Sequence, residues 1–313
     1  MGQIVLNVPD QIVKEMKQAY QSYLKPSPPG AIFSAKVNAI TITGYKSGKV
    51  LFQGGNPEFE ATKWEKHMVE PGDGTGTKNA SKLTHNYYPD QALLSQSIIG
   101  SDEAGTGDYF GPITVAAVYA EAKQIDLLKE LGVRDSKNLT DQSIQQIAKQ
   151  MLLLNLPYSL VVLHNPKYNQ LQQQGWTQGK MKALLHHTAI SHVLDKLGTT
   201  KPAGIVIDQF CQPEVYLRHL KSENKQLPEQ TYFMTKAESH SIAVAAASIL
   251  ARARFVQEMA RLSKQVGFEL PKGASAKVDQ VAARLIKQHG MVKLKEFAKL
   301  HFANTTKARN YLN

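Results

Sequence analysis

The stretch that decides the fold runs from residue 98 to residue 107 and reads Ile98-Ile99-Gly100-Ser101-Asp102-Glu103-Ala104-Gly105-Thr106-Gly107. It predicts an apolar strand that leads directly into an Asp-Glu pair and then into a glycine-rich turn. In open α/β sheets ligands gather at the carboxyl ends of strands, so Asp102 and Glu103 occur where a site is expected. Successive strand residues point to opposite faces, so both acids serve one site only if the chain bends, which Gly105 and Gly107 permit. An acidic turn that caps a hairpin is the alternative for this segment alone.

Two later segments repeat this arrangement. The run Gly204-Ile205-Val206-Ile207-Asp208 predicts a buried strand ending in a carboxylate, and charges seldom end an apolar strand without a partner or a metal. The segment from Thr231 to Glu238 predicts a strand that delivers Glu238 to the start of a helix. A helix N-terminal acid favoured by the helix dipole is the alternative for Glu238 taken alone.

Together these segments bring four carboxylates to three strand ends, namely Asp102, Glu103, Asp208 and Glu238. Clustered anions repel one another and lose solvation when buried, so such a group persists mainly when divalent cations neutralise it. Oxygen ligands with open water positions suit Mg²⁺ or Mn²⁺ rather than zinc. Two such ions about 4 Å apart can hold a phosphodiester, activate a water and stabilise the leaving oxygen. The residues therefore predict metal-assisted phosphodiester hydrolysis.

The whole sequence divides into two domains and a linker. Residues 1–70 predict a small α+β domain with helices at 10–24 and 57–68 and strands at 31–36, 38–43 and 49–53. Residues 71–96 are interpreted as a linker, because the stretch 70–82 is rich in Gly, Thr, Ser and Asn without an apolar period. Residues 97–313 predict an α/β domain, a mixed sheet with flanking helices. Its expected strands are 97–103, 111–120, 158–164, 203–209 and 230–235, and its expected helices are 140–153, 176–197, 238–263, 276–289 and 291–300.

The distribution of charge favours a polyanionic partner. The 313 residues include 37 Lys and Arg against 26 Asp and Glu, which gives a net charge of +11. Residues 1–88 carry +3 and residues 252–313 carry +9, whereas the stretch between them carries −1. The excess favours nucleic acid or an anionic membrane surface, and basic flanks around a near-neutral centre suit an enzyme that holds a polyanion at its edges and cations at its centre. A solvated basic surface is the alternative.

Other classes of protein are disfavoured. Cys211 is the only cysteine, so no intramolecular disulfide or Cys-rich zinc site can form. The N-terminal residues lack a signal-peptide pattern, and the most apolar run, 242–251, is too short to span a bilayer. The glycines between Gly105 and Gly111 miss the dinucleotide fingerprint by one residue, so no nucleotide cofactor is expected. We expect a cytoplasmic protein that is monomeric and has no membrane partner.

Several segments resemble bacterial ribonuclease HIII in both order and spacing. The segments are GSDEAGTGDYFGPITVAAVY (100–119), LGVRDSKNLT (131–140), GIVIDQF (204–210), TKAESHSIAVAAASILAR (235–252), LPKGAS (270–275) and KLHFANT (299–305). The resemblance is highly specific and covers residues 97–307. Residues 1–70 resemble that family's N-terminal domain, which is similar to a half-repeat of the TATA-box-binding-protein fold and is implicated in substrate binding.

The resemblance implies a ribonuclease H-like fold and an endonuclease that depends on Mg²⁺ or Mn²⁺. Its substrate would be the RNA strand of RNA/DNA hybrid duplexes, and its products would carry 5′-phosphate and 3′-hydroxyl ends. It assigns both catalysis and metal binding to Asp102, Glu103, Asp208 and Glu238. Thr106 and Glu238 fit ribonuclease HIII, because ribonuclease HII usually has Gly-Arg/Lys-Gly after its Asp-Glu pair and Asp as its fourth acid. Ribonuclease HII also uses a tyrosine to incise at single ribonucleotides; we find no clear counterpart and expect that activity to be poor.

Further residues are candidates for substrate contacts. The backbone amides of Gly105, Thr106 and Gly107 could approach the ribose 2′-hydroxyl, which distinguishes RNA from DNA. Ser136 and Lys137 could contact a phosphate at the rim of the site, although a solvated loop fits them nearly as well.

In the N-terminal domain, Lys36, Lys46, Lys49 and Tyr45 combine basic and aromatic side chains on a small sheet, which could grip a duplex by its backbone. An ordinary exposed face is the alternative. Arg252 and Arg254 are candidates to face the substrate, but helix-surface charge is the simpler interpretation. His186 and His187 lie mid-helix without a Glu at zinc-protease spacing and are interpreted as surface or core residues.

A duplex-binding protein whose acids are only structural is the competing hypothesis, because the flanking charge alone would suit it. The absence of cleavage at any Mg²⁺ or Mn²⁺ concentration would favour that hypothesis. Ribonucleotide removal of the ribonuclease HII type is the second alternative, and efficient incision at a single embedded ribonucleotide would favour it.

Overall fold

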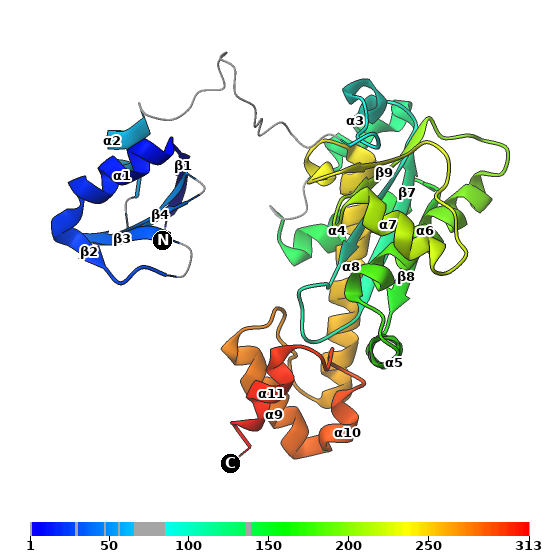
Figure 1. The fold of residues 1–313 in the computed structure, drawn as a ribbon. Coiled ribbons are helices and arrows are strands. Elements are labelled where there is room, and N and C mark those ends of the chain that lie inside the picture. The colour runs from blue at the N-terminus through cyan, green and yellow to red at the C-terminus, as the bar shows by residue number, and fades with distance from the viewer. Residues whose placement is uncertain are drawn as a thin grey trace. The chain divides into compact units, whose positions relative to one another are not determined.

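The computed structural model describes residues 2–28, 31–46, 48–55, 57–65, 85–134 and 139–312. The chain divides into two compact units, residues 1–81 and 82–313 (Figure 1). Each unit has its own five-stranded sheet and its own hydrophobic core. The candidate residues Ser136 and Lys137 and most of the expected linker lie outside the described residues.

The first unit is an antiparallel sheet with two helices on one face, in the order β1-β5-β4-β3-β2. Val13 and Met16 of the first helix pack against Phe33, Ile42 and Phe52 of the sheet in one buried cluster. The first strand pairs along its whole length with β5 and was missed by the sequence prediction. The elements are β1 (Gly2–Asn7), α1 (Asp10–Ala19), η1 (Gln21–Tyr23), β2 (Leu24–Lys25), β3 (Ala31–Val37), β4 (Ile40–Tyr45), β5 (Lys49–Gly54) and α2 (Pro57–Glu65).

The second unit is built on a mixed sheet in the order β10-β9-β6-β7-β8. The strands β6, β9 and β10 run parallel to one another, whereas β7 pairs antiparallel with β6, and β8 pairs antiparallel with β7. The α/β class and the mixed sheet expected from the sequence are therefore confirmed. The strands are β6 (Ile98–Ala104), β7 (Ile113–Ala120), β8 (Tyr158–Leu163), β9 (Gly204–Asp208) and β10 (Thr231–Met234).

Helices cover both faces of this sheet (Figure 1). Helices α4 and α8 share one buried cluster with Ile98, while α6 and α7 share another with Ile99, because neighbouring strand residues point to opposite faces. Near-continuous apolar strands such as β7 follow from burial on both faces. These helices and turns are η2 (Gln91–Ser95), η3 (Ala122–Gln124), α3 (Ile125–Glu130), α4 (Asp141–Leu152), α5 (Asn165–Gln173), α6 (Gln178–Leu197), α7 (Pro213–Lys221), η5 (Ala237–Ser239) and α8 (Ile242–Val266).

The C-terminal residues form a helical cluster against the second half of α8. The helices α9 (Ala276–His289), α10 (Met291–Leu294) and α11 (Ala303–Arg309) enclose Tyr109 and Phe110, which follow the glycine-rich turn. The prediction of a helix over 291–300 is wrong beyond residue 294, because Ala298 forms a β-bridge with Phe110. The prediction of a helix from residue 238 is also wrong at its start, because Ser241 caps α8 and Glu238 lies in the preceding turn. Within the described residues no helix is long and apolar enough to cross a membrane.

Gly100 lets β6 lie directly against α8. A Cβ atom at this position would come within 2.2 Å of Ala243 C and Val244 N, which are backbone atoms of the helix. Ala246 and Ala247 lie three and four residues after Ala243 on α8 and so share its helix face, and the small buried side chains of all three permit the same close approach. Since Asp102 follows two residues later, this contact sets the distance between the acidic strand end and the helix.

We expect Gly100→Ala to lower the free energy of unfolding of the second unit by about 1–3 kcal/mol, because backbone atoms of α8 cannot move aside as a flexible side chain would. Chemical denaturation followed by circular dichroism measures the change. Gly107→Ala is the matched control, because nothing lies within 4 Å of a Cβ atom there. Equal unfolding midpoints for the two variants would contradict this account of the β6–α8 contact.

Candidate active site

The four predicted carboxylates lie where three neighbouring strands end. The last pair between β6 and β9 joins Ser101 to Ile207, and the last pair between β9 and β10 joins Asp208 to Met234. Because the three strands are parallel, their carboxyl ends meet at one edge of the sheet. The acids at or just beyond these last pairs are Asp102, Glu103, Asp208 and Glu238.

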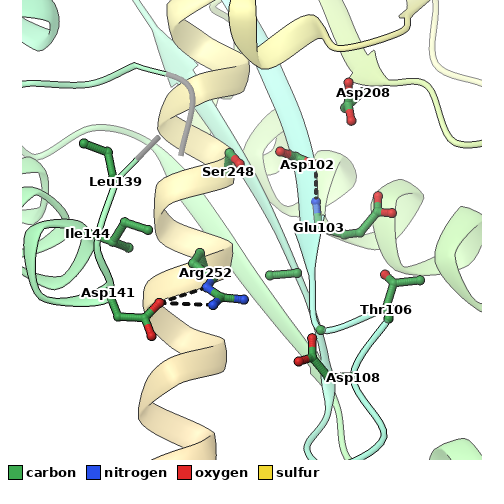
Figure 2. A pocket seen from close by; sticks show the side chains of 13 residues that line it. Asp102, Glu103, Thr106, Asp108, Leu139, Asp141, Ile144, Asp208, Ser248 and Arg252 are labelled. Atoms are coloured by element: carbon green, nitrogen blue, oxygen red, sulfur yellow. Dashed lines mark hydrogen bonds and ion pairs between the residues drawn. The ribbon is translucent and has the colours of Figure 1, made fainter. Parts of the chain in front are cut away.

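A pocket of about 520 Å³ opens at this edge (Figure 2). The acidic ends of β6 and β9 and the glycine-rich turn form one wall, and α4 and α8 form the other. Glu238 does not line the pocket, but its negative charge raises the pKa of Asp208. The lining residues are Asp102, Glu103, Ala104, Gly105, Thr106, Gly107, Asp108, Leu139, Asp141, Ile144, Asp208, Ser248 and Arg252.

Asp102 points toward α8 (Figure 2) and is only 6% exposed. Its Oδ1 accepts a hydrogen bond of 2.6 Å from the backbone N–H of Glu103, and its side chain is also hydrogen-bonded to Ser248. Burial, followed by the negative charges of Asp208 and Glu103, raises the pKa of Asp102 well above its ordinary value. The ionised form of Asp102 is therefore costly in the absence of a nearby cation.

Glu103 points to the other face of the sheet, toward α6. Lys182 Nζ donates to Glu103 Oε1 at 2.7 Å, and His186 Nε2 lies 2.8 Å from Glu103 Oε2. Burial acts to raise the pKa of Glu103, but the hydrogen bonds and charges of His186 and Lys182 outweigh it and hold the pKa below its ordinary value. β6 continues through both acids without a bend, so Asp102 and Glu103 reach one pocket because it opens at the end of the sheet.

Lys182 and His186 are contacts that the sequence interpretation missed. His186 is fully buried, as a core histidine would be, but its ring contacts an acid of the site. The two residues are one helical turn apart on α6, so they present a lysine and a histidine on the same face. That spacing was the available signal, but nothing local showed which acid it would meet.

Asp208 and Glu238 form the third part of the site. Asp208 Oδ1 accepts a 2.8 Å hydrogen bond from the backbone N–H of Ala237, which ties the end of β9 to the turn that carries Glu238. Burial and then the charge of Glu238 raise the pKa of Asp208 to about 7. Glu238 itself is only 3% exposed, and the two side chains share a hydrogen bond.

The glycine-rich turn closes one side of the pocket. Gly105 has a φ of +85°, and a Cβ atom there would come within 2.3 Å of Pro112 O, so glycine is required. Gln178 of α6 donates to Thr106 O at 3.1 Å and holds the turn beside the acids. Gly107 has open space in front of its Cα atom, which leaves room for a ligand.

The two candidate arginines have different surroundings. Arg252 lines the pocket and forms an ion pair of 3.1 Å with Asp141, drawn with dashed lines in Figure 2. Lys272 also forms an ion pair with Asp141. Arg254 pairs instead with Glu258 at 2.7 Å, outside the pocket. Of the two arginines, only Arg252 is therefore placed at the pocket.

The donor set of this pocket suits a hard divalent cation. It consists of carboxylate oxygens, and the repulsion between Asp102 and Asp208 is what a bound cation would offset. In the described ranges no three His, Cys, Asp or Glu side chains lie close enough together to enclose an ion. Asp102, Glu103 and Asp208 thus share a pocket, and a closed ligand shell would require side-chain rotation.

Comparison with known proteins agrees with this geometry. Residues 99–305 match the family model described as Ribonuclease HII, and residues 3–73 match a domain of unknown function, DUF3378. Fold and site together define an endonuclease of the ribonuclease H class.

Curated relatives narrow the assignment. Ribonuclease HIII of Oceanobacillus iheyensis is 57% identical over 310 residues, which cover 99% of each chain. The crystal structure of Bst-RNase HIII in complex with Mn²⁺ is 41% identical, has a TM-score of 0.68 and covers 100% of this chain and 99% of that one. Aquifex aeolicus RNase H3, at 21% identity and a TM-score of 0.53, shares the fold. The chain belongs to the ribonuclease HIII family.

The raised pKa of Asp208 predicts how stability depends on pH. Between its ordinary value of 3.8 and about 7 the folded chain binds more protons than the unfolded chain, so stability falls as pH rises through this interval. In excess chelator, Asp208→Asn should therefore raise the free energy of unfolding at about pH 8 by roughly 1–3 kcal/mol and leave it unchanged near pH 4. Thermal and chemical unfolding at both pH values measure the difference.

Asp126→Asn is the control, because the side chain of Asp126 is 90% exposed and does not line the pocket. Added Mn²⁺ should reduce the gain, because a cation would offset the same repulsion. The same pH profile in wild type and Asp208→Asn would refute the coupling between Asp208 and Glu238.

Proposed function

We propose that the chain hydrolyses the RNA strand of RNA/DNA hybrids with two divalent cations and leaves 5′-phosphate and 3′-hydroxyl ends. The observation that carries the proposal is the meeting of four carboxylates at the ends of β6, β9 and β10 beside an open pocket. When bound, two such cations would hold the phosphodiester, activate a water and stabilise the leaving oxygen. Mn²⁺ has support from the complex of the related Bst-RNase HIII, and Mg²⁺ has the same preference for oxygen ligands.

The positions of the four acids suggest a different part in metal binding for each. Asp102 and Asp208 line the pocket and repel each other, so they are the ligands that gain most from a cation between them. Glu103 would complete the shell from the α6 side, and Glu238 would act on the far side of Asp208. The open edge of the sheet leaves room for the ribose-phosphate backbone.

The glycine-rich turn is the segment that we propose contacts the ribose of the RNA strand. Gly105, Thr106 and Gly107 line the pocket beside Glu103, and the open space at Gly107 would let a sugar approach the backbone. A backbone amide at this position could contact the 2′-hydroxyl, which is present only in RNA. Arg252, held by Asp141 on the opposite wall, is a candidate contact for a phosphate.

The first unit is the proposed second contact with the duplex, acting through the sheet face that α1 and α2 do not cover. Lys36 and Lys49 alternate with the core residues of β3 and β5 and so point to this face. Lys25 points the same way, because it pairs with Ser34, the strand neighbour of the core residue Ala35. Every described Asp and Glu of this unit lies on α1 or α2. Lysines without neighbouring acids suit a phosphate backbone. Lys46 is exposed in the turn after β4, and Tyr45 is the last residue of that strand.

Asp102→Asn should abolish cleavage of a labelled RNA/DNA hybrid by at least about 10³-fold, because it removes a charge that the cations need. Binding of the hybrid should survive, because the proposed contacts with the phosphate backbone of the duplex are made by other residues. Gel analysis of cleavage with Mg²⁺ or Mn²⁺, beside a filter-binding assay, measures both quantities. Asp195→Asn, on α6 outside the pocket, is the control.

The same assay should compare hybrid, duplex RNA, duplex DNA and a duplex with one embedded ribonucleotide. We expect cleavage of the hybrid and poor incision at the single ribonucleotide, since no tyrosine is among the described residues that line the pocket. Full activity of Asp102→Asn, or of the wild type in excess chelator, would rule out the proposed mechanism.

Replacing Lys36 and Lys49 together by Gln should raise KM for the hybrid several-fold and change kcat little, because these lysines would act on binding rather than chemistry. The slope of log Kd against log salt should fall by about 2, because each of these lysines would neutralise one phosphate. The double variant Lys14→Gln and Lys17→Gln on α1 is the matched control of equal charge. An unchanged KM and salt slope in the β-sheet variant would exclude this face from substrate binding.

A further inference from the structure

Glu103 is already matched by two basic side chains of one helix. Lys182 Nζ and His186 Nε2 contact its two oxygens at 2.7 and 2.8 Å. The side chains of Lys182 and Glu103 are only 10% and 12% exposed, so water screens their pairing weakly. Glu103 is thus compensated before any divalent cation arrives.

The surroundings hold this arrangement in place. Ser101 Oγ donates to Ala116 O at 2.9 Å and lies 2.7 Å from His186 Nδ1, so the imidazole is held between Ser101 and Glu103. The ring of Phe210 stacks on His186 at 5.3 Å and lies 3.9 Å from Lys182 Nζ. Such packing fixes the direction of both basic side chains.

The other pocket acids have a different environment. Among the described residues no Lys, Arg or His side chain forms an ion pair with Asp102 or Asp208, whose hydrogen bonds come from the backbone N–H groups of Glu103 and Ala237 and from Ser248 and Glu238. The pocket is therefore divided into an acidic side at Asp102 and Asp208 and a compensated side at Glu103. On the first side a divalent cation would meet carboxylates that form no ion pair within the described part of the chain, because Arg252 of the facing wall pairs with Asp141. On the second side it would meet a carboxylate that already pairs with the ammonium of Lys182.

We propose that Lys182 is a built-in counter-ion that weakens the binding of a divalent cation at Glu103, with His186 as the positioning residue that orients the carboxylate. This inference rests on the proposed function, in which Glu103 is a metal ligand. Each carboxylate oxygen keeps a lone pair beyond the one that meets its basic partner, so Glu103 can still bind a cation, but beside a positive charge. Of the two metal positions, the one at Glu103 then binds its cation more weakly than the one at Asp102 and Asp208.

Titration of the metal-free full-length chain with Mn²⁺, followed by calorimetry and by the electron paramagnetic resonance of free Mn²⁺, tests the proposal without substrate. Lys182→Met should bind the weaker Mn²⁺ about five- to tenfold more tightly, because it removes a unit charge 2.7 Å from the carboxylate that would hold the ion. Lys182→Arg, which keeps the charge, should retain the wild-type affinity. Lys180→Met is the matched control, since Lys180 lies on the same helix and pairs with Glu223.

Lys182→Gln is a second variant that removes the charge but keeps a hydrogen-bond donor for Glu103. It replaces Lys182→Met in the titration if thermal unfolding shows that the Met variant is not folded. Unchanged or weaker Mn²⁺ binding in the charge-removing variant that folds would overturn the proposal, as would equal tightening in Lys180→Met.

Glu103→Gln separates this inference from the function on which it rests. If Glu103 is a ligand, Glu103→Gln weakens Mn²⁺ binding, and adding Lys182→Met to it no longer tightens binding. If Glu103→Gln leaves Mn²⁺ binding untouched, the proposed ligand role of Glu103 fails together with the inference. If Glu103→Gln weakens binding while Lys182→Met changes nothing, the inference alone is wrong.

Discussion

Buried carboxylates repel one another, and this repulsion governs the second unit of the chain. Asp102 and Asp208 raise each other's cost of ionisation at the edge of the sheet, and Glu238 adds to that cost at Asp208. A fold tolerates such a group only when cations, hydrogen bonds or protonation offset the repulsion. The backbone N–H groups of Glu103 and Ala237 offset part of it, and Lys182 and His186 compensate Glu103. What remains uncompensated is the side of the pocket where a divalent cation would gain most.

The rest of the unit serves to hold these acids in fixed positions. The parallel run of β6, β9 and β10 brings their ends to one edge, and the contact between Gly100 and α8 keeps β6 close to the helix that carries Ser248 and Arg252. On the other face α6 supplies Lys182 and His186, and Gln178 of the same helix holds the glycine-rich turn. Rigid strands and helices thus surround a pocket whose irregular wall is the turn proposed to meet the ribose.

The sequence predicted the parts that depend on local patterns. Apolar runs that end in acids located Asp102, Glu103 and Asp208 at strand ends, and the element order predicted the mixed α/β sheet. The start of α8 was misjudged, because Ala237 hydrogen-bonds Asp208 and keeps Glu238 in a turn of its own. The helix predicted over 291–300 was too long, because Ala298 pairs with Phe110 from a distant part of the chain. The contacts of Lys182 and His186 with Glu103 could not be predicted, because they join residues 79 and 83 positions apart through the packing of α6 on the sheet.

The most direct test of the central claim is a crystal structure of the full-length chain grown with Mn²⁺, with the ions located by anomalous scattering. The account predicts Mn²⁺ peaks inside the pocket, with carboxylate oxygens of Asp102 and Asp208 at about 2.1–2.3 Å, within the range of oxygen ligands to hard divalent cations. Anomalous peaks only outside the pocket, or a pocket whose acids stay more than about 4 Å from every ion, would contradict it.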